Sequence, residues 1–333
     1  MDKFILGIES TAHTFGVAVC SKGKVLSNLR DMYTTEKGGI VPLDSAKHHN
    51  AVCDRLLSEA LAKANITEKE ITAIAFSQGP GIAPCLLAGI HFVKKLAAKL
   101  NVPVIPVNHC IAHLEIGRLT GAKDPVLLYA SGANTQIIAY AAGKYRVFGE
   151  TLDIGVGNFI DTFAREAGIG FPGGPKIAEF AEKCKTKDKL IELPYSIKGM
   201  DVAFAGIQTK LKQMLAKKEH SLEELSYSMQ ETVFAMLVEA SERAIAHTGK
   251  KELLLGGGVA CNSRLQEMCR LMCEQRGIKF FCPERQYLID NPAMIAYTGE
   301  IMYEKGIFTK SEEVKDLDIK PRQRTDDVEI KYK

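Results

Sequence analysis

Two stretches of this chain, about 120 residues apart, follow the same pattern. Residues 5–25 read ILGIESTAHTFGVAVCSKGKV and residues 126–148 read VLLYASGANTQIIAYAAGKYRVF. Each combines apolar runs with a short polar turn and a glycine turn, which predicts three strands joined by two tight turns. A period this long does not indicate a solenoid. It favours two related lobes facing a shared cleft, the alternative being a chance likeness of two hairpins.

The likeness extends to single residues of the polar turns. The aligned pairs are Ser10 with Ser131, Ala12 with Ala133, and Thr14 with Thr135. Each copy continues with helical and strand-like apolar spacings, so the predicted element order is βββαβα, repeated once. We therefore expect an α/β protein with a first lobe over 1–120 and a second over 121–333. The last helix and the tail are candidates to pack back on the first lobe.

Composition sets the broad class of the protein. The chain has 333 residues, of which 46% are hydrophobic and 25% charged, as in globular proteins. No run of about 18 uncharged apolar residues predicts a membrane span, and the N-terminus does not resemble a signal peptide. The nine cysteines form no CxxC pair, which indicates thiols in a reducing compartment and a cytoplasmic protein. A net charge of +3 is weak evidence for a nucleic-acid partner.

A histidine pair follows a short strand-like run in the sequence VNHCIAHLEIG. His109 and His113 are four residues apart, so on a helix their side chains point about 40° apart on one face. Such a pair can bind one metal ion, or it can simply pack on the helix face. A zinc-protease motif would place a glutamate directly after the first histidine, where this chain has Cys110. The spacing therefore indicates a metal site without the protease base.

Two further residues are candidates for this site. Asp290 lies in a polar gap before Pro292 and the last predicted helix, where it could be a third metal ligand or a helix N-cap. Tyr129 ends a predicted strand beside the second polar turn, a position that is usually buried structure.

Several glycine turns suggest a nucleotide cleft. The chain has no P-loop motif and no complete dinucleotide fingerprint. It does have the turn at 131–134, Gly173-Gly174, and the run 256–258 that opens GGGVACN. Small turns let backbone N–H groups approach a phosphate closely, although each turn alone can be ordinary turn chemistry.

Many segments together resemble one family over almost the whole chain, the tRNA adenosine threonylcarbamoyltransferases. The likeness is best to the archaeal and eukaryotic branch, the catalytic subunit of the KEOPS complex, once described as sialoglycoprotein endopeptidases. The matching segments are GIESTAHTFGVAV, TTEKGGI, SQGPGIAP, VNHCIAHLEIG, LLYASGANTQ, ETLDIGVGNFID, FPGGP, LLLGGGVACN, LIDNPAMIAYTG and QRTDDVEI.

The resemblance implies an actin-like fold, which agrees with the internal repeat. It implies one divalent metal, iron(II) with zinc as the alternative, held by His109, His113 and Asp290, with Tyr129 nearby. It implies an adenylate site lined by Tyr129, Ala130, Ser131, Gly132, Ala133, Asp161, Gly174 and Asn262. Two positions depart from the family pattern. Ala133 stands where a glycine is common, and the family's glutamate after FPGGP falls at Ala178 or at Glu179.

The implied activity is transfer of a threonylcarbamoyl group from threonylcarbamoyl-AMP to N6 of the adenine 3′ of the anticodon. The implied partners are tRNA, the kinase-like ATPase subunit of KEOPS and its small subunits, with no kinase fused to this chain. No general base is assigned, and His13 in the first polar turn is a candidate proton carrier. An actin-like ATPase or sugar kinase would need a carboxylate in that turn, where residues 10–13 read STAH. A non-catalytic scaffold for tRNA and protein is the other alternative.

Overall fold

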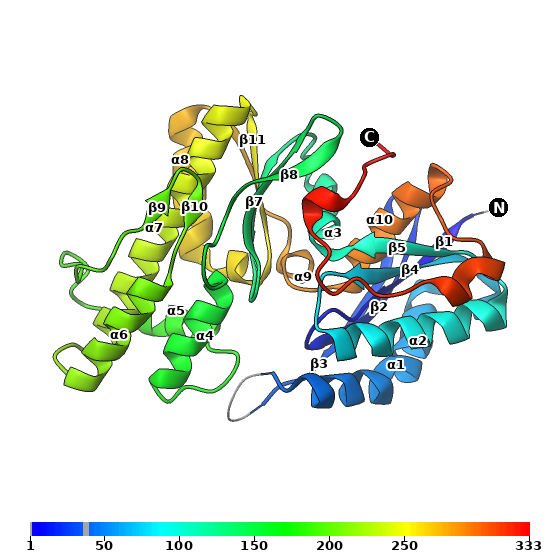
Figure 1. The fold of residues 1–333 in the computed structure, drawn as a ribbon, viewed down its shortest axis with the longest axis horizontal. Coiled ribbons are helices and arrows are strands. Elements are labelled where there is room, and N and C mark those ends of the chain that lie inside the picture. The colour runs from blue at the N-terminus through cyan, green and yellow to red at the C-terminus, as the bar shows by residue number, and fades with distance from the viewer. Residues whose placement is uncertain (1, 36–39) are drawn as a thin grey trace.

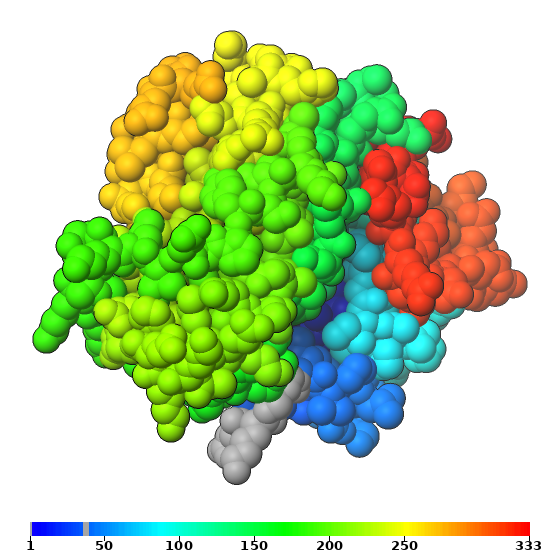
Figure 2. Space-filling model, turned by 60° about the vertical axis from the view of Figure 1, so that its left-hand side comes forward, coloured from blue at the N-terminus to red at the C-terminus, as the bar shows by residue number. Residues whose placement is uncertain are grey.

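The computed structural model describes residues 2–35 and 40–333 (Figure 1). Residues 36–39 lie outside the described residues, and with them part of the TTEKGGI motif. Figure 2 shows that the surface is hollowed between the two halves of the chain, with the blue N-terminal segment deep in the hollow.

Sheet A carries the first half of the chain and has the strand order β3-β2-β1-β4-β5. Its strands are β1 (Phe4–Glu9), β2 (Thr14–Ser21), β3 (Lys24–Met32), β4 (Ile71–Gly79) and β5 (Val104–Asn108). The first three form the predicted antiparallel meander, whereas β4 and β5 run parallel to β1. Helices cover both faces of this sheet, so β1 and β2 are buried almost throughout.

Sheet B repeats this arrangement in the second half, with the order β8-β7-β6-β11-β12. Its strands are β6 (Val126–Ala130), β7 (Thr135–Ala141), β8 (Lys144–Glu150), β11 (Glu252–Gly256) and β12 (Lys279–Phe281). The second turn of each meander also matches: Lys22-Gly23 and Ala142-Gly143 all have positive φ, as a type I′ hairpin requires. The common strand order and turn type confirm the predicted duplication.

Helices α1 (Pro42–Ala64) and α2 (Ala83–Leu100) pack on one face of sheet A, and α10 (Pro292–Glu304) packs on the other (Figure 1). The contact with α10 is close, because a Cβ at Gly7 would lie 2.4 Å from the backbone nitrogen of Ala296. The last predicted helix therefore packs against the first sheet. The lobe boundaries 1–120 and 121–333 remain our proposal.

Sheet B carries more helices than predicted. They are α4 (Val156–Glu166), α5 (Gly174–Lys183), α6 (Ala205–Lys217), α7 (Leu222–Thr248) and α8 (Ser263–Arg276). The predicted order βββαβα provides only two helices for the second lobe, and α5 and α6 are additions to it. Each of these two buries only two side chains fully, Ile177 and Ala181 in α5 and Ile207 and Leu211 in α6, so each contributes little to the core. A hairpin of two short strands, β9 (Ile197–Lys198) and β10 (Asp201–Val202), lies between α5 and α6 in the sequence.

The remaining helices connect the two halves. Helix α3 (His109–Glu115) follows β5 of sheet A, but Cys110, Ile111 and Leu114 pack in a core with residues of sheet B. The single-turn helix α9 (Arg285–Leu288) precedes α10. The 3-10 helices are η1 (Glu68–Glu70), η2 (Ile116–Thr120), η3 (Gly258–Cys261), η4 (Ser311–Asp316) and η5 (Thr325–Asp327).

Two sequence-based expectations concern membrane-spanning segments and the state of the cysteines. Among the described residues, no helix has both the length and the apolar character needed to cross a membrane. All nine cysteines are free thiols, and seven of them are buried.

Burial of His49 predicts a loss of stability in acid. This α1 residue is fully buried against Phe15, and burial, followed by the neighbouring His48, lowers its pKa to about 4. Unfolded histidine titrates near 6.5, so between these values the unfolded chain binds a proton that the folded chain excludes. The stabilisation is complete above pH 6.5 and is lost as pH falls towards 4, by about 2–3 kcal/mol between pH 7.5 and 4.5.

Urea unfolding of the protein and of His49→Leu at these two pH values measures this effect. The pH-dependent difference should shrink in His49→Leu and stay unchanged in His247→Leu, an exposed control. An equal pH dependence in all three proteins would contradict the assignment.

Candidate metal centre

The two histidines lie at the start of α3, where β5 ends at the cleft. Asn108 is the N-cap of this helix, and its side chain accepts a hydrogen bond from Ile111 N at 3.1 Å. The cap fixes the first turn, and the rings of His109 and His113 lie edge to face with their centroids 4.8 Å apart. Both imidazoles are almost fully buried. The i,i+4 pair is therefore a fixed pair of nitrogen donors.

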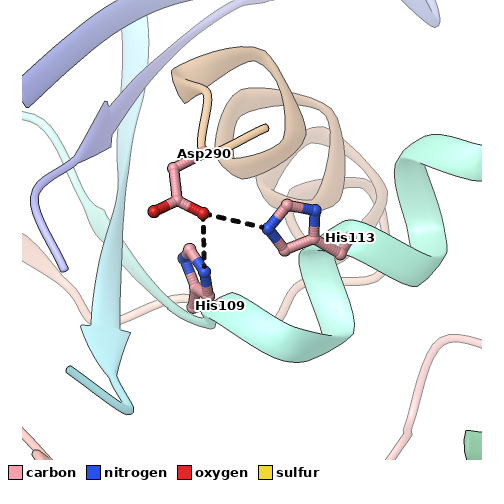
Figure 3. A group of neighbouring side chains, drawn as sticks. All are labelled: His109, His113 and Asp290. Carbon is pink, nitrogen blue, oxygen red and sulfur yellow. Dashed lines mark hydrogen bonds and ion pairs between the residues drawn. The ribbon is translucent and has the colours of Figure 1, made fainter. Parts of the chain in front are cut away.

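Asp290 lies just before α10, and its carboxylate lies next to both imidazoles. The N-cap of α10 is Asn291, whose side chain accepts from Met294 N at 3.0 Å, so Asp290 is not needed for capping. Its Oδ1 lies 3.4 Å from Nε2 of His109 and 3.4 Å from Nε2 of His113 (Figure 3). The predicted ligands thus converge, with all three donor atoms within 4.8 Å of one another.

The spacing of these atoms fits ligands of one ion. Two donors about 2.1 Å from a tetrahedral metal lie about 3.4 Å apart, which is the separation found from Asp290 to each histidine. An N–H···O hydrogen bond would ordinarily be 2.7–3.2 Å long. Two imidazoles and one carboxylate are a donor set that suits both iron and zinc. These three residues therefore fit the metal that the resemblance implies.

Glu9 holds His109 in place and was not predicted as a site residue. Its carboxylate is completely buried at the end of β1, and Oε2 lies 3.0 Å from Nδ1 of His109. Its other oxygen accepts from the backbone N and the hydroxyl of Thr11, at 2.8 and 2.5 Å. An Nδ1–H bond to Glu9 leaves Nε2 of His109 free to face Asp290, the arrangement common among metal-binding histidines. The sequence signal was a carboxylate ending the apolar run FILGI.

Charges in this cluster favour protonation of His109 beside an ionised Asp290. Burial opposes protonation of His109, but Glu9 and Asp290 outweigh it and raise its pKa well above the usual value. Burial opposes ionisation of Asp290, but His109 and His113 lower the pKa of its carboxyl well below the usual value. Burial lowers the pKa of His113, which favours a neutral ring. A cationic ligand would find a carboxylate already ionised here.

Tyr129 lies beside the cluster at the end of β6. Its ring centroid is 4.9 Å from that of His113, and the side chain is almost completely buried. Burial raises the pKa of its phenol well above the usual value, so the hydroxyl is a neutral group next to the site. A Cβ at Gly256 would contact both His113 and Tyr129, so the glycine run lies directly against these side chains.

Three glycine segments meet at the second polar turn, residues 131–134. A Cβ at Gly257 would lie 2.3 Å from the carbonyl oxygen of Ala130, and one at Gly157 would lie 2.7 Å from that of Ser131. The amides of Gly157 and Asn158, in the first turn of α4, donate to the carbonyl oxygens of Ser131 and Gly132. These glycines therefore let three backbone segments touch, which places them beside the metal-ligand cluster.

Other glycines leave room instead. A Cβ at Gly174 would have no neighbour within 4 Å, and one at Gly132 would meet only the Asn158 side chain at 3.4 Å. Ala133 is exposed on the same turn, so its extra methyl group displaces nothing. Open backbone of this kind is where a phosphate could approach N–H groups.

Asp161 and His13 both contact the FPGGP loop at the rim of the cleft. Oδ1 of Asp161 accepts from Gly173 N at 2.8 Å, so this α4 carboxylate holds the FPGGP loop. Burial raises the pKa of Asp161. His13, from the first lobe, contacts Phe171 of that loop edge to face, with ring centroids 5.7 Å apart. The predicted residues of both lobes thus come together across the cleft at this rim.

Two predicted adenylate residues have other partners. Asn262 is the N-cap of α8, accepting from Arg264 N at 2.9 Å, and its amide donates to Gln230. Glu179 is on the exposed side of α5, where it pairs with Lys183 at 2.7 Å. In the described part of the chain, Glu179 makes no hydrogen bond to another predicted adenylate residue. Its predicted role, and that of Ala178, therefore gains no support from the geometry.

Comparison with known proteins gives a consistent family match. The family model described as TsaD, tRNA N6-adenosine threonylcarbamoyltransferase, matches residues 24–297. A Thermococcus kodakarensis protein named tRNA N6-adenosine threonylcarbamoyltransferase is 53% identical over 325 residues, which cover 98% of each chain. A Methanosarcina mazei protein, named a probable bifunctional tRNA threonylcarbamoyladenosine biosynthesis protein, is 50% identical. That match covers 99% of this chain and 59% of the relative.

Solved structures share the fold at low sequence identity. The crystal structure of Thermococcus kodakarensis HypF matches with a TM-score of 0.65 and 15% identity, covering 95% of this chain and 49% of that one. Component A of (R)-2-hydroxyglutaryl-CoA dehydratase from Acidaminococcus fermentans matches with a TM-score of 0.55 and 13% identity, covering 91% and 98%. These likenesses, with the two matching sheets, confirm the predicted bilobal, actin-like fold.

Proposed function

The chain belongs to the family of tRNA N6-adenosine threonylcarbamoyltransferases, and we propose that it forms threonylcarbamoyladenosine beside the anticodon of tRNA. It is a transferase of threonylcarbamoyladenosine synthesis. In the proposed reaction the donor is threonylcarbamoyl-AMP and the acceptor is N6 of the adenine 3′ of the anticodon, in tRNAs that read codons beginning with A.

One observation carries the chemical part of this proposal. Two imidazoles from one half of the chain and a carboxylate from the other converge at the cleft, beside the glycine turns. An ATPase or sugar kinase of this fold would need a carboxylate free to bind Mg²⁺ near the first turn. The carboxylate found there, Glu9, is bound to Thr11 and His109. The site is therefore better suited to acyl transfer than to phosphoryl transfer.

The bond changes assign roles to the residues around the cleft. A bond forms between N6 of adenine and the carbamoyl carbon, the bond from that carbon to the phosphate oxygen breaks, and AMP leaves. An exocyclic adenine amine is a weak nucleophile, so catalysis depends on positioning and on stabilising the charge that develops. Open backbone at Gly132 and Gly174 would hold the AMP phosphate. His13, at the cleft rim, would accept the N6 proton.

A divalent metal, iron(II) or zinc, held by His109, His113 and Asp290, would supply Lewis-acid polarisation of a substrate oxygen. Glu9 fixes the ring that faces this position. Tyr129 presents a neutral hydroxyl beside His113, and we propose it as a contact to substrate or metal.

Partners are also part of the proposal. The Methanosarcina mazei relative is named bifunctional, and this chain covers only 59% of its length. We propose that the kinase-like ATPase of the KEOPS complex works with this chain, together with the small KEOPS subunits and tRNA. Nine free thiols fit a reducing compartment, and we propose the cytoplasm as the place of action.

Incorporation of labelled threonine into tRNA tests the proposed reaction. The assay contains bicarbonate, ATP, an enzyme that makes the adenylate, and the partner subunits, with this chain present or omitted. We expect label in tRNA only when the chain is present, and digestion should place it on the adenine 3′ of the anticodon. Adenylate that accumulates without label in tRNA would contradict the proposal and favour an ATPase or scaffold.

A further inference from the structure

Positive charge is concentrated in one segment of the second lobe. Residues 176–218 contain ten lysines and five carboxylates, a net charge of +5, whereas the whole chain has a net charge of +3. The rest of the chain is therefore slightly acidic. The ten are Lys176, Lys183, Lys185, Lys187, Lys189, Lys198, Lys210, Lys212, Lys217 and Lys218. We call this set the lysine surface.

Most of these lysines lack a counter-charge. All ten are exposed. Four pair with a carboxylate within 4 Å, namely Lys176, Lys183, Lys212 and Lys217. In the described ranges, 2–35 and 40–333, the other six form no such pair. A surface that serves only solubility ordinarily mixes the two signs of charge. An excess of unpaired lysines is instead the electrostatic pattern of a polyanion-binding face.

The place of this segment in the fold relates it to the cleft. It comprises α5, the β9–β10 hairpin and α6, which have no counterpart between the meander and the long helix of the first lobe. Helix α5 begins at Gly174, directly after the loop in which Phe171 contacts His13 across the cleft. Figure 1 shows that the loop between α5 and β9 lies at the outer edge of the second lobe, away from the first lobe. The lysine surface therefore starts at the rim of the site and extends outward.

We propose that the lysine surface binds the sugar-phosphate backbone of the tRNA whose anticodon loop enters the cleft. This inference rests on the proposed function for the identity of the polyanion. An adenine in the cleft leaves the backbone on either side of it outside, and lysines that extend outward from the rim can neutralise phosphates along that backbone. Lysine contacts of this kind are independent of sequence and release counterions, so binding weakens as salt rises.

The test compares two triple variants with the unmodified protein in complex with its partners. The first is Lys185→Gln, Lys187→Gln, Lys189→Gln, in the exposed segment after α5. The matched control is Lys24→Gln, Lys63→Gln, Lys69→Gln, three exposed lysines of the first lobe that form no ion pair within the described residues. Both remove three charges, and thermal unfolding checks that both fold.

We expect the first variant to weaken tRNA binding about tenfold near 0.15 M salt. Its slope of log K against log salt should fall by about two to three, since each phosphate contact contributes about 0.7–0.9. The control variant should match the unmodified protein in tRNA affinity and in the salt dependence of binding. KM for tRNA in the transfer assay should rise to the same extent.

Other outcomes would overturn the proposal in distinguishable ways. If both variants bind tRNA as the unmodified protein does, and transfer proceeds, the lysine surface is not the tRNA site although the proposed function stands. If the first variant instead loses the kinase-like subunit while keeping its tRNA affinity, the surface contacts protein. If the unmodified complex neither binds tRNA nor transfers the group, the proposed function fails as well.

Discussion

Replacement of both His109 and His113 by alanine is expected to abolish metal binding and to lower threonylcarbamoyl transfer by about 10³-fold or more. Polarisation of a substrate oxygen by a bound metal contributes several kcal/mol, and each 1.4 kcal/mol corresponds to a factor of ten in rate. The two nitrogens are two of the three converging donors, and Asp290 alone cannot hold an ion firmly. Metal content after dialysis and labelled transfer to tRNA measure the two effects separately.

The controls must separate chemistry from folding, because both imidazoles are buried and their removal leaves a cavity. Asp290→Asn keeps the shape of the side chain and removes only the charge, and it should lose metal as well. His91→Ala, at an exposed position of α2, should behave like the unmodified protein. A folded double variant that transfers at the normal rate would show the histidine pair to be structural.

Glu9→Gln is expected to weaken metal binding by about 10–100-fold although Glu9 is not itself a ligand. The carboxylate fixes the tautomer and the orientation of His109 through its 3.0 Å contact to Nδ1, and loss of such partners typically has this effect. Glutamine has nearly the same size, so the core around β1 should be preserved. Metal affinity is measured by competition with a chelator, and transfer is measured at saturating metal.

Glu300→Gln is the matched control, since Glu300 is also a buried carboxylate beside sheet A, accepting from Gly23 N at 3.0 Å. It should leave the metal affinity unchanged. Equal affinities for the Glu9→Gln variant and the unmodified protein would mean that Glu9 has no role in positioning His109.

The repeat in the sequence was sufficient to predict the architecture, because a strand meander has a strong local signal. In each copy of the repeat, alternating apolar residues predict the strands. Gly23 in the first copy and Gly143 in the second mark the tight turn between the last two strands. Helices α5 and α6 were missed because each is short and buries only two residues fully, and because they have no counterpart in the first copy of the repeat.

The metal-ligand cluster was predicted only in part for a related reason. His109 and His113 are visible as an i,i+4 pair, whereas Asp290 was ambiguous until the structure showed that Asn291 caps α10. Glu9 lies 100 residues before His109, and no local pattern connects them. The contacts of Asp161 with the FPGGP loop are likewise set by tertiary packing.

The crossing of α3 and α10 has a consequence for how the chain folds. Helix α3 follows a strand of sheet A and packs on sheet B, while α10 follows the strands of sheet B and packs on sheet A. The two halves thus exchange helices as the subunits of a domain-swapped dimer do, but within one chain. The cores in which α3 and α10 pack therefore contain residues of both halves. The contact between His109 and Asp290 therefore requires both halves of the chain to be in place.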